Sequence, residues 1–348
     1  MLEFRTMRQN RFLTGVVALA ATLALAACGG SSKDEDAAAG SSTAAFPITI
    51  KHALGTTTIK EKPKRVATVA WANHEVPLAL GIVPVGMAKA NFGDDDGDGI
   101  LPWVAEKLKS LGGTAPVLFD ENDGINFEAV ADTQPDVILA AYSGLTAQEY
   151  ETLSKIAPVV AYPEGPWATA WRDTIKLESQ ALGLAKEGDA LIADFEKQMT
   201  DATAKYPQLA GKSAMFMTHV DPTDLSKIGF YTTHDTRAQF FADLGLKVPG
   251  SIATLSAGTD KFSLNQSAEQ IQVFNDVDVI VAYGDDKLLA AAQADPLLSK
   301  IPAIKRGSVV MLSGTTPLGT AANPTPLAIP FVLNDYVAML AKAADQVS

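Results

Sequence analysis

The chain has 348 residues, of which 47% are apolar, and a formal net charge of −12. This length suffices for two domains of ordinary size, and the apolar content excludes disorder of the whole chain. The acidic balance, without a basic stripe, argues against nucleic acid as a partner because nothing is available to neutralise phosphates. With a single cysteine, no intramolecular disulfide can form.

Residues 1–27 have the pattern of a secretory signal peptide. Three arginines precede an apolar run at residues 12–27, as in a charged region followed by a hydrophobic one. The run is shorter than the roughly 20 residues that a membrane-spanning helix needs. It ends in LAAC at residues 25–28, which resembles the bacterial lipobox. The resemblance implies a palmitate-bearing lipid anchor on Cys28, at the extracytoplasmic face of the cell membrane. The alternative is a signal peptide followed by a chance cysteine.

Residues 28–45 predict a flexible tether. After Cys28 they read GGSSKDEDAAAGSSTAA, which is small, polar and without periodicity. About seventeen such residues span roughly 20–25 Å. We therefore expect the folded part to float just above a membrane without being embedded in it. Removal of residues 1–27, which carry three arginines and one glutamate, would leave a net charge of −14.

Residues 46–184 predict an N-terminal lobe of alternating strands and helices. Alternation indicates a hairpin at 46–60, and Asn73 is expected to cap the helix after the first buried strand. The predicted strands span residues 66–71, 82–87, 135–142 and 158–162. The predicted helices span residues 74–80, 101–110, 126–133, 146–155 and 168–182.

A long amphipathic helix at residues 185–206 is predicted to connect this lobe to the next. Apolar residues recur along it at spacings of three and four, whereas charged residues occupy the other sides. About twenty residues at 1.5 Å each make a rigid rod of roughly 30 Å, the width of a small domain. The apolar stripe consists of Leu191, Phe195, Met199, Ala202 and Tyr206.

Residues 207–348 predict a C-terminal lobe that resembles the first in its pattern. On each side of the rod, a short helix with an early glutamate precedes a buried strand that opens on Asp-Val. Strands that alternate with helices indicate mainly parallel sheets. The predicted fold class is therefore α/β, with two Rossmann-like lobes, one rigid connecting helix and a ligand cleft between the lobes. The alternative is one large α/β domain with an ordinary surface helix. Strands are expected at residues 213–220, 229–232, 277–283 and 309–312, and helices at 235–244, 267–275 and 326–344.

Three stretches carry a resemblance to a known family. They read KPKRVATVAWANHEVPLALGIVPVGMA at residues 62–88, INFEAVADTQPDVILAAYSG at 125–144 and AEQIQVFNDVDVIVAYG at 268–284. Together they resemble the substrate-binding lipoprotein of an iron–siderophore ABC importer, in the family that also holds the vitamin B12 and haem binders. The resemblance covers nearly the whole chain from residue 46 and implies two α/β lobes bridged by a single helix. It also implies a monomeric receptor that captures a ferric siderophore, needs no cofactor and delivers its ligand to a permease.

The expected ligand site lies at the carboxyl ends of the strands, where open parallel sheets bind ligands. A ferric siderophore is a bulky, mostly apolar shell with exposed oxygens, so flat aromatic rings and forked arginine donors suit it. For each tryptophan the alternative is core packing, and for Arg237 it is an ordinary helix surface charge. The predicted ligand-binding residues are Trp71, Trp103, Tyr142, Trp171, Arg172, Tyr231, Arg237 and Tyr283, with Trp167 as a further candidate.

Two glutamates are candidates for contact with the permease. Glu128 and Glu269 each begin a predicted helix, one in each lobe. In the family that this chain resembles, one glutamate on each lobe meets arginines of the permease, and these two match in position. The alternative is the ordinary preference of helix starts for negative charge.

The stretch NFGDDDGDG at residues 91–99 matches the first half of an EF-hand loop. Asp94, Asp96 and Asp98 alternate and Gly99 follows, and such oxygen ligands suit Ca²⁺. The glutamate that would complete the loop falls one position late, at Glu106. The alternative is a solvated acidic loop.

The sequence gives weaker support to other functions, namely an enzyme, a haem receptor or a metal-ion receptor. No nucleophile elbow, Walker loop, GxGxxG or HExxH motif is present, so no catalytic residue is predicted. Two alternatives are a haem receptor with Tyr231 or a histidine as axial ligand, and a Zn²⁺ or Mn²⁺ receptor using His74, His219 and His234. The acidity repels trianionic ferric catecholates at long range, which slightly favours neutral or cationic hydroxamates or mixed-ligand siderophores.

Overall fold

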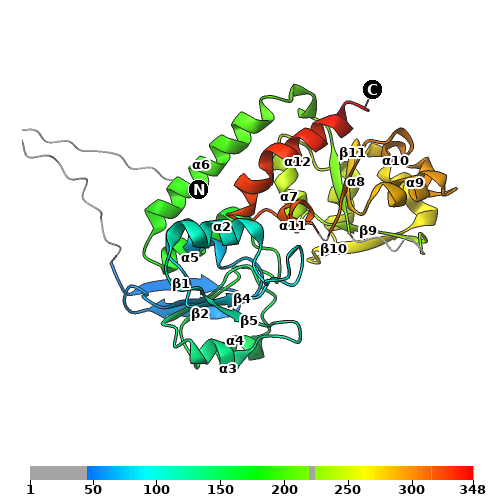
Figure 1. Cartoon of the computed structure of the whole chain (residues 1–348). Coiled ribbons are helices and arrows are strands. Elements are labelled where there is room, and N and C mark those ends of the chain that lie inside the picture. Colours follow the sequence, from blue (N-terminus) through cyan, green and yellow to red (C-terminus); the bar gives the residue numbers. More distant parts are fainter. Residues whose placement is uncertain (1–44, 219–223, 315, 348) are drawn as a thin grey trace, which may run out of the picture. The chain divides into compact units, whose positions relative to one another are not determined.

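The computed structural model describes residues 45–218, 224–314 and 316–347. They form two lobes, each built on a five-stranded sheet (Figure 1), and an antiparallel hairpin of β1 (Ile48–His52) and β2 (Gly55–Ile59). The predicted fold class, α/β with two lobes and a long connecting helix, is confirmed. Within the described ranges, no helix combines the length and the hydropathy of a membrane span.

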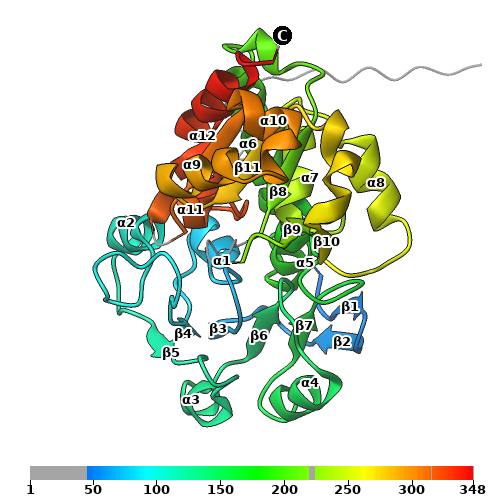
Figure 2. The same cartoon turned by 90° about the vertical axis from the view of Figure 1, so that its right-hand side faces the viewer.

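The N-terminal lobe contains a parallel sheet in the order β5-β4-β3-β6-β7. Figure 2 shows α3 and α4 on one side of it and α1 on the other. Strands covered on both faces are apolar throughout, and β6 is buried at every position. The edge strand β5 was not predicted; of its three residues only Phe119 is buried. The strands are β3 (Val66–Thr68), β4 (Gly86–Ala88), β5 (Val117–Phe119), β6 (Val137–Ala140) and β7 (Val159–Ala161). The helices are α1 (Glu75–Ala79), α2 (Pro102–Leu111), α3 (Phe127–Asp132), α4 (Ala147–Leu153) and α5 (Trp171–Ala181).

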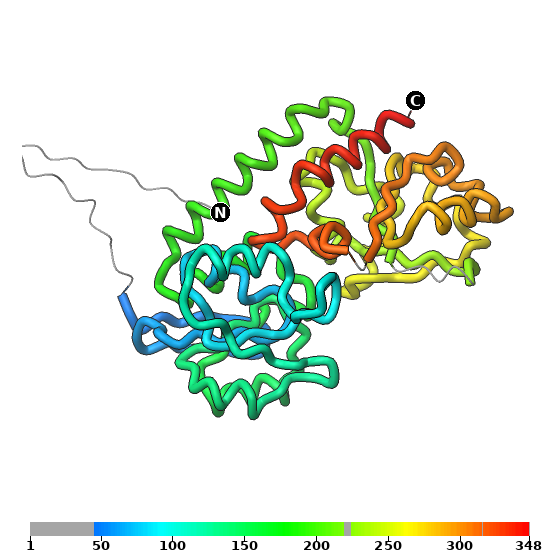
Figure 3. The backbone as a smooth tube through the Cα atoms, in the orientation of Figure 1, coloured from blue at the N-terminus to red at the C-terminus, as the bar shows by residue number. Residues whose placement is uncertain are grey.

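The connecting helix is α6 (Ala185–Thr203), which runs beside α12 (Ala328–Ala344) in Figure 3 and packs against α5. Its close approach to α5 requires a glycine, because a Cβ on Gly188 would lie 2.1 Å from Ser179 Oγ. The face of α6 turned toward the protein is the predicted stripe with small shifts. Its buried members are Gly188, Ile192, Phe195, Met199 and Ala202.

The C-terminal lobe has a mixed sheet in the order β10-β9-β8-β11-β12. Strands β8, β11 and β12 are parallel, whereas β9 and β10 add an antiparallel pair at one edge. The helix predicted at 267–275 is a 3₁₀ helix with a kinked backbone. The strands are β8 (Ala214–Met217), β9 (Lys227–Tyr231), β10 (Ser263–Ser267), β11 (Val279–Tyr283) and β12 (Val309–Leu312). The other helices are η1 (Pro207–Leu209), α7 (Thr236–Asp243), α8 (Gly250–Ser256), η2 (Ala268–Asp276), α9 (Asp286–Ala294), η3 (Leu298–Lys300), α10 (Pro302–Arg306) and α11 (Pro317–Ala321).

The two lobes share one hydrophobic core. Val76 of α1 belongs to the same buried cluster as Phe240 of α7 and Tyr336 of α12. The lobes are also tied by hydrogen bonds, since the buried carboxylate of Glu75 accepts from the Leu327 amide at 2.7 Å, just before α12 begins. The α6 helix is therefore not the sole connection between the lobes.

Candidate functional site

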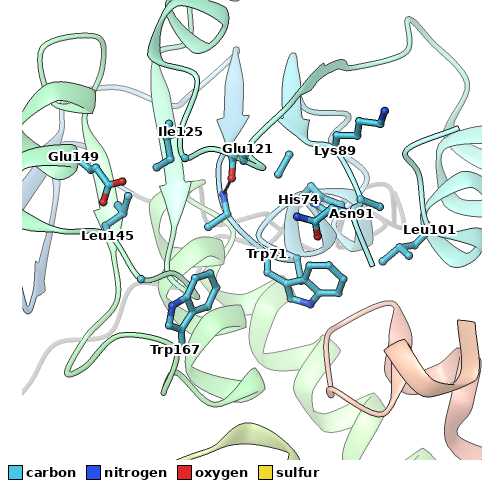
Figure 4. Close-up of a pocket in the computed structure, with 16 residues that line it drawn as sticks. Trp71, His74, Lys89, Asn91, Leu101, Glu121, Ile125, Leu145, Glu149 and Trp167 are labelled. Carbon is cyan, nitrogen blue, oxygen red and sulfur yellow. Dashed lines mark hydrogen bonds between the residues drawn. The ribbon is translucent and has the colours of Figure 1, made fainter. Parts of the chain in front are cut away.

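Two adjoining cavities form a cleft at the junction of the lobes. The first, of about 320 Å³, is lined by residues of the N-terminal lobe (Figure 4). The second, of about 330 Å³, is lined by residues of both lobes. Trp71, Asn91 and Trp167 stand in the walls of both cavities. The two cavities are therefore parts of one elongated site.

Trp71 lies on a loop with an unusual backbone. Ala70 and Ala72, on either side of it, have φ angles of +61° and +62°, in the left-handed region that residues other than glycine seldom adopt. Conformations of this kind cost free energy and cluster at ligand sites. Figure 4 shows the Trp71 ring beside the cavity, opposite the ring of Trp167.

Asn73 holds the end of this loop and is not a helix cap. The expected cap is wrong, because α1 begins at Glu75 after His74 and has no side-chain cap. Asn73 is instead fully buried: its amide nitrogen donates to the carbonyls of Val69 at 2.7 Å and Tyr142 at 2.9 Å. Its oxygen accepts from the Tyr142 amide at 2.8 Å. Asn73 thus ties the carboxyl ends of β3 and β6 together.

Trp167 forms the facing wall and is likewise fixed by its neighbours. Its φ angle is +59° and its amide donates to the Ser143 carbonyl at 2.9 Å. Its ring meets that of Tyr142 edge-on at 5.5 Å between centroids. A Cβ on Gly144 would lie 2.2 Å from Trp167 Nε1, so the glycine makes room for the indole.

Arg237 brings one cation to the second cavity from the first turn of α7. Its guanidinium lies 3.9 Å from the centroid of Tyr231 and bonds to both oxygens of Asp235 at 2.9 and 2.7 Å. Burial alone would lower the pKa of Arg237, but contact with Asp235 raises it well above the usual range. The arginine is therefore a permanently charged, immobilised donor, and Tyr231 lies beneath it as a support.

Two buried tyrosines and one exposed phenylalanine complete the second cavity. Tyr142 is close to Asn323, whose amide nitrogen lies 3.4 Å from the phenol oxygen. The Tyr283 ring packs edge-on against Phe92 at 6.1 Å. Burial raises the pKa of Tyr142 and of Tyr283, so both phenols remain neutral at physiological pH. Phe262, 40% exposed, lines the open side.

The first cavity ends in an acidic group that the sequence did not reveal. Glu121 follows β5 by two residues and accepts from the Ala70 amide at 2.9 Å. Burial raises the pKa of its carboxyl to about 7. Lys89 and Glu149 line the same cavity. The signal that could have found Glu121 is its place after a strand, but that strand, β5, was itself missed.

The chain matches the family model described as periplasmic binding protein over residues 66–315. The chain belongs to the periplasmic binding protein family. The crystal structure of PiaA from Streptococcus pneumoniae TIGR4 in complex with ferrichrome is 48% identical, with a TM-score of 0.83, and the match covers 86% of this chain and 100% of that one. The probable siderophore-binding lipoprotein YfiY of Bacillus subtilis is 29% identical over 268 residues, 76% of each chain. The iron(3+)-hydroxamate-binding protein YxeB of Bacillus subtilis is 26% identical over 248 residues, 71% of this chain and 70% of its own.

In this periplasmic binding protein, four of the expected ligand residues line neither cavity. Tyr231 supports Arg237 from beneath, and the other three are Trp103, Trp171 and Arg172. Trp103 is buried and donates to Glu75 at 2.7 Å. Trp171 and Arg172 donate to the two oxygens of Asp243, at 2.9 and 2.8 Å. The contacts of Trp171 and Arg172 join α5 to α7 across the lobes, and the Trp103 ring packs 5.1 Å from that of Phe331 in α12. The structure therefore places the three side chains in the junction of the lobes. We therefore leave them out of the proposed ligand site.

The histidines do not assemble a metal centre among the described residues. His74 lines the first cavity, and burial lowers its pKa to about 4, which keeps it neutral. Neither His74 nor His234 belongs to a cluster of three metal-ligating side chains in the described ranges. His219 lies outside the described residues.

The aspartate loop brings three carboxylates together. Asp94, Asp96 and Asp98 have oxygens within 4.8 Å of one another. They accept backbone hydrogen bonds that shape the turn, for example from the Gly97 and Gly99 amides to Asp94 at 2.9 and 2.7 Å. Calcium binding here stays a prediction, since these bonds also explain the loop without an ion.

The two expected docking glutamates are exposed at the starts of their helices. Glu128 lies in the first turn of α3, after the cap Asn126, and Glu269 lies in the first turn of η2, after the cap Ser267. Both carboxylates are thus available to a partner, one from each lobe. Their role stays a prediction.

Proposed function

We propose that the protein captures a ferric hydroxamate siderophore in this cleft and delivers it to the permease of an ABC importer. The observation that carries the proposal is the convergence of Trp71, Trp167 and Phe262 with Arg237 on one continuous cavity. Flat rings suit the apolar shell of such a chelate, and a fixed guanidinium suits its exposed oxygens. The siderophore already coordinates its iron, so the site needs no metal ligand and no catalytic residue.

The charges around the cleft support a neutral ligand. Arg237 is already matched by Asp235, and Lys89 shares its cavity with Glu121 and Glu149. A ferric tris-catecholate would bring three negative charges into surroundings without a matching surplus of cations, which is unfavourable where water is displaced. A ferric tris-hydroxamate is neutral and meets no such cost. YxeB, named for iron(3+)-hydroxamate, and the ferrichrome complex of PiaA support the same class.

Titration of the intrinsic tryptophan fluorescence tests the ligand class. The panel contains ferrichrome, a ferric catecholate, ferric citrate, hemin and Zn²⁺, with iron-free ferrichrome as the control. We expect quenching at submicromolar ferrichrome and none by the iron-free form. A response to hemin alone or Zn²⁺ alone would replace the proposal with the haem or the metal-ion alternative.

For delivery, we propose that Glu128 and Glu269 dock on arginines of the permease, one from each lobe. A single exposed pair contributes only about 0–1 kcal/mol, so the two lobes must dock together. The double variant E128A/E269A should lose uptake in whole cells and keep the ferrichrome affinity of the purified protein. Unimpaired uptake would remove both residues from the docking surface.

For location, we propose a monomer held by a lipid on Cys28 at the extracytoplasmic face of the membrane. The LAAC motif at residues 25–28 and the tether after it support this, as does the name of YfiY as a lipoprotein. The mass of the mature protein and labelling with palmitate test it. C28S should abolish the label; an unmodified mature N-terminus in the wild type would contradict the anchor.

A further inference from the structure

Trp71 lies on a strained loop and lines both cavities of the site. Ala70 and Ala72 hold left-handed φ angles of +61° and +62°. Such conformations persist only where neighbouring groups enforce them. The groups bonded to this loop therefore decide where the Trp71 ring lies.

Among the residues that the structure describes, two side chains bond to the loop. Asn73 donates to the carbonyls of Val69 at 2.7 Å and Trp71 at 3.3 Å. Glu121 accepts from the Ala70 amide at 2.9 Å, a bond drawn in Figure 4. It reaches the loop from the end of β5, two strands away from β3 in the sheet. Asn73 does not titrate, so Glu121 is the titratable one of these two anchors.

We propose that Glu121 is a positioning residue whose carboxylate holds the Ala70 amide and thereby fixes the Trp71 ring against the ligand. The inference rests on the proposed function, because it assigns Trp71 to the ligand. Oε1 of Glu121 is buried without a hydrogen-bond partner in the described part of the chain. The carboxylate therefore makes its hydrogen bond to the loop through Oε2 alone. Without this acceptor, the strained amide of Ala70 would lose its bond.

The neighbours of Glu121 make this anchor sensitive to pH. Burial raises the pKa of Glu121 to about 7, the Ala70 amide opposes the shift and Glu149 of α4 adds to it. Lys89, after β4, and His74, before α1, line the same cavity. The carboxylate form thus prevails above pH 7. Because a charged acceptor bonds about twice as strongly as a neutral one, ligand affinity should be highest above pH 7 and fall below it.

Ferrichrome titrations between pH 6 and pH 8 test the inference with four proteins. The wild type should lose about fivefold in affinity from pH 8 to pH 6, the ratio expected from a charged against a neutral acceptor. E121Q, which keeps a neutral acceptor, should bind at both pH values as the wild type does at pH 6. E121A should bind more weakly still and show no pH dependence.

E149Q is the matched control. It removes a carboxylate from the same cavity without touching the Trp71 loop, and Gln can still accept the Thr146 bonds at the start of α4. It should keep the size of the pH effect and shift its midpoint to lower pH, because Glu149 raises the pKa of Glu121. A pH effect that vanishes in E149Q and survives in E121Q would overturn the inference.

A measurement without ligand separates this inference from the proposed function. In nitrogen–proton correlation spectra of the ligand-free protein, the Ala70 amide resonance should shift with a midpoint near pH 7, as burial sets the pKa of its acceptor. The shift should be absent in E121Q. If ferrichrome does not bind at all, the proposed function fails, and this pH titration alone then tests whether Glu121 holds the Ala70 amide. An Ala70 resonance that does not move with pH in the wild type would refute the role of Glu121.

Discussion

Arg237 at the cleft and Arg172 at the junction of the lobes have nearly the same surroundings. Each guanidinium lies over an aromatic ring, 3.9 Å from Tyr231 for Arg237 and 4.1 Å from Trp171 for Arg172. Each also bonds to a carboxylate of the C-terminal lobe, Asp235 or Asp243. Only Arg237 lines a described cavity large enough for a ligand.

The comparison shows that the arrangement of arginine, ring and carboxylate immobilises a charge without deciding its use. At the cleft, the immobilised charge faces open space and can meet a ligand. At the junction, Arg172 is shared between Asp243 and Glu196 and ties α5 to α7 and α6. In the described part of the chain, the two arginines differ in that a cavity lies in front of Arg237 and not in front of Arg172. The local arrangement of arginine, ring and carboxylate does not decide this difference.

The largest expected effect is at Arg237. R237A should weaken ferrichrome binding at least tenfold and, by leaving the buried Asp235 unpaired, lower the free energy of unfolding by about 3–5 kcal/mol. Titration and thermal unfolding measure the two losses. The double variant D235N/R237L should recover stability, because Asn also caps α7, and still fail to bind. Recovery of binding in that variant would show that the charge of Arg237 does not contact the ligand.

A pair of tryptophan variants separates the two regions. W171A should lower the free energy of unfolding by about 3–5 kcal/mol, since a large buried side chain leaves a cavity, while the folded fraction binds normally. W71A, from a partly exposed ring, should keep most of the stability and weaken ferrichrome binding on the order of tenfold. Equal effects of both variants on binding would contradict the division into cleft and junction.

The smallest effect is expected at Arg172. Its side chain is 31% exposed, so R172A should lower the free energy of unfolding by only about 1 kcal/mol or less. Ferrichrome affinity should change less than twofold. An affinity loss as large as that of R237A would return Arg172 to the ligand site.

Regular patterns in the sequence predicted the elements that bury one face or all of their residues. The α6 stripe was found from its helical period and β6 from its continuous apolar run, and both patterns report burial directly. The helix predicted from residue 146 is confirmed as α4, and the structure shows a capping box between Thr146 and Glu149 at its start. The strand β10 was missed because SLNQS is polar and mostly half-exposed, which gives no such signal.

The sequence by itself determined the two-lobe α/β fold, the family and four of the residues that line the cleft. Trp71, Tyr142 and Tyr283 lie at the carboxyl ends of parallel strands, whereas Arg237 lies in the first turn of α7, after the antiparallel strand β9. The structure brings all four to its cavities. Only the tertiary structure placed Trp103, Trp171 and Arg172 elsewhere and brought Glu121 beneath the Trp71 loop. The physical reason is that the pattern of apolar residues reports how each element is buried. Whether a given side chain faces a ligand depends instead on which side chains of other elements occupy the space next to it.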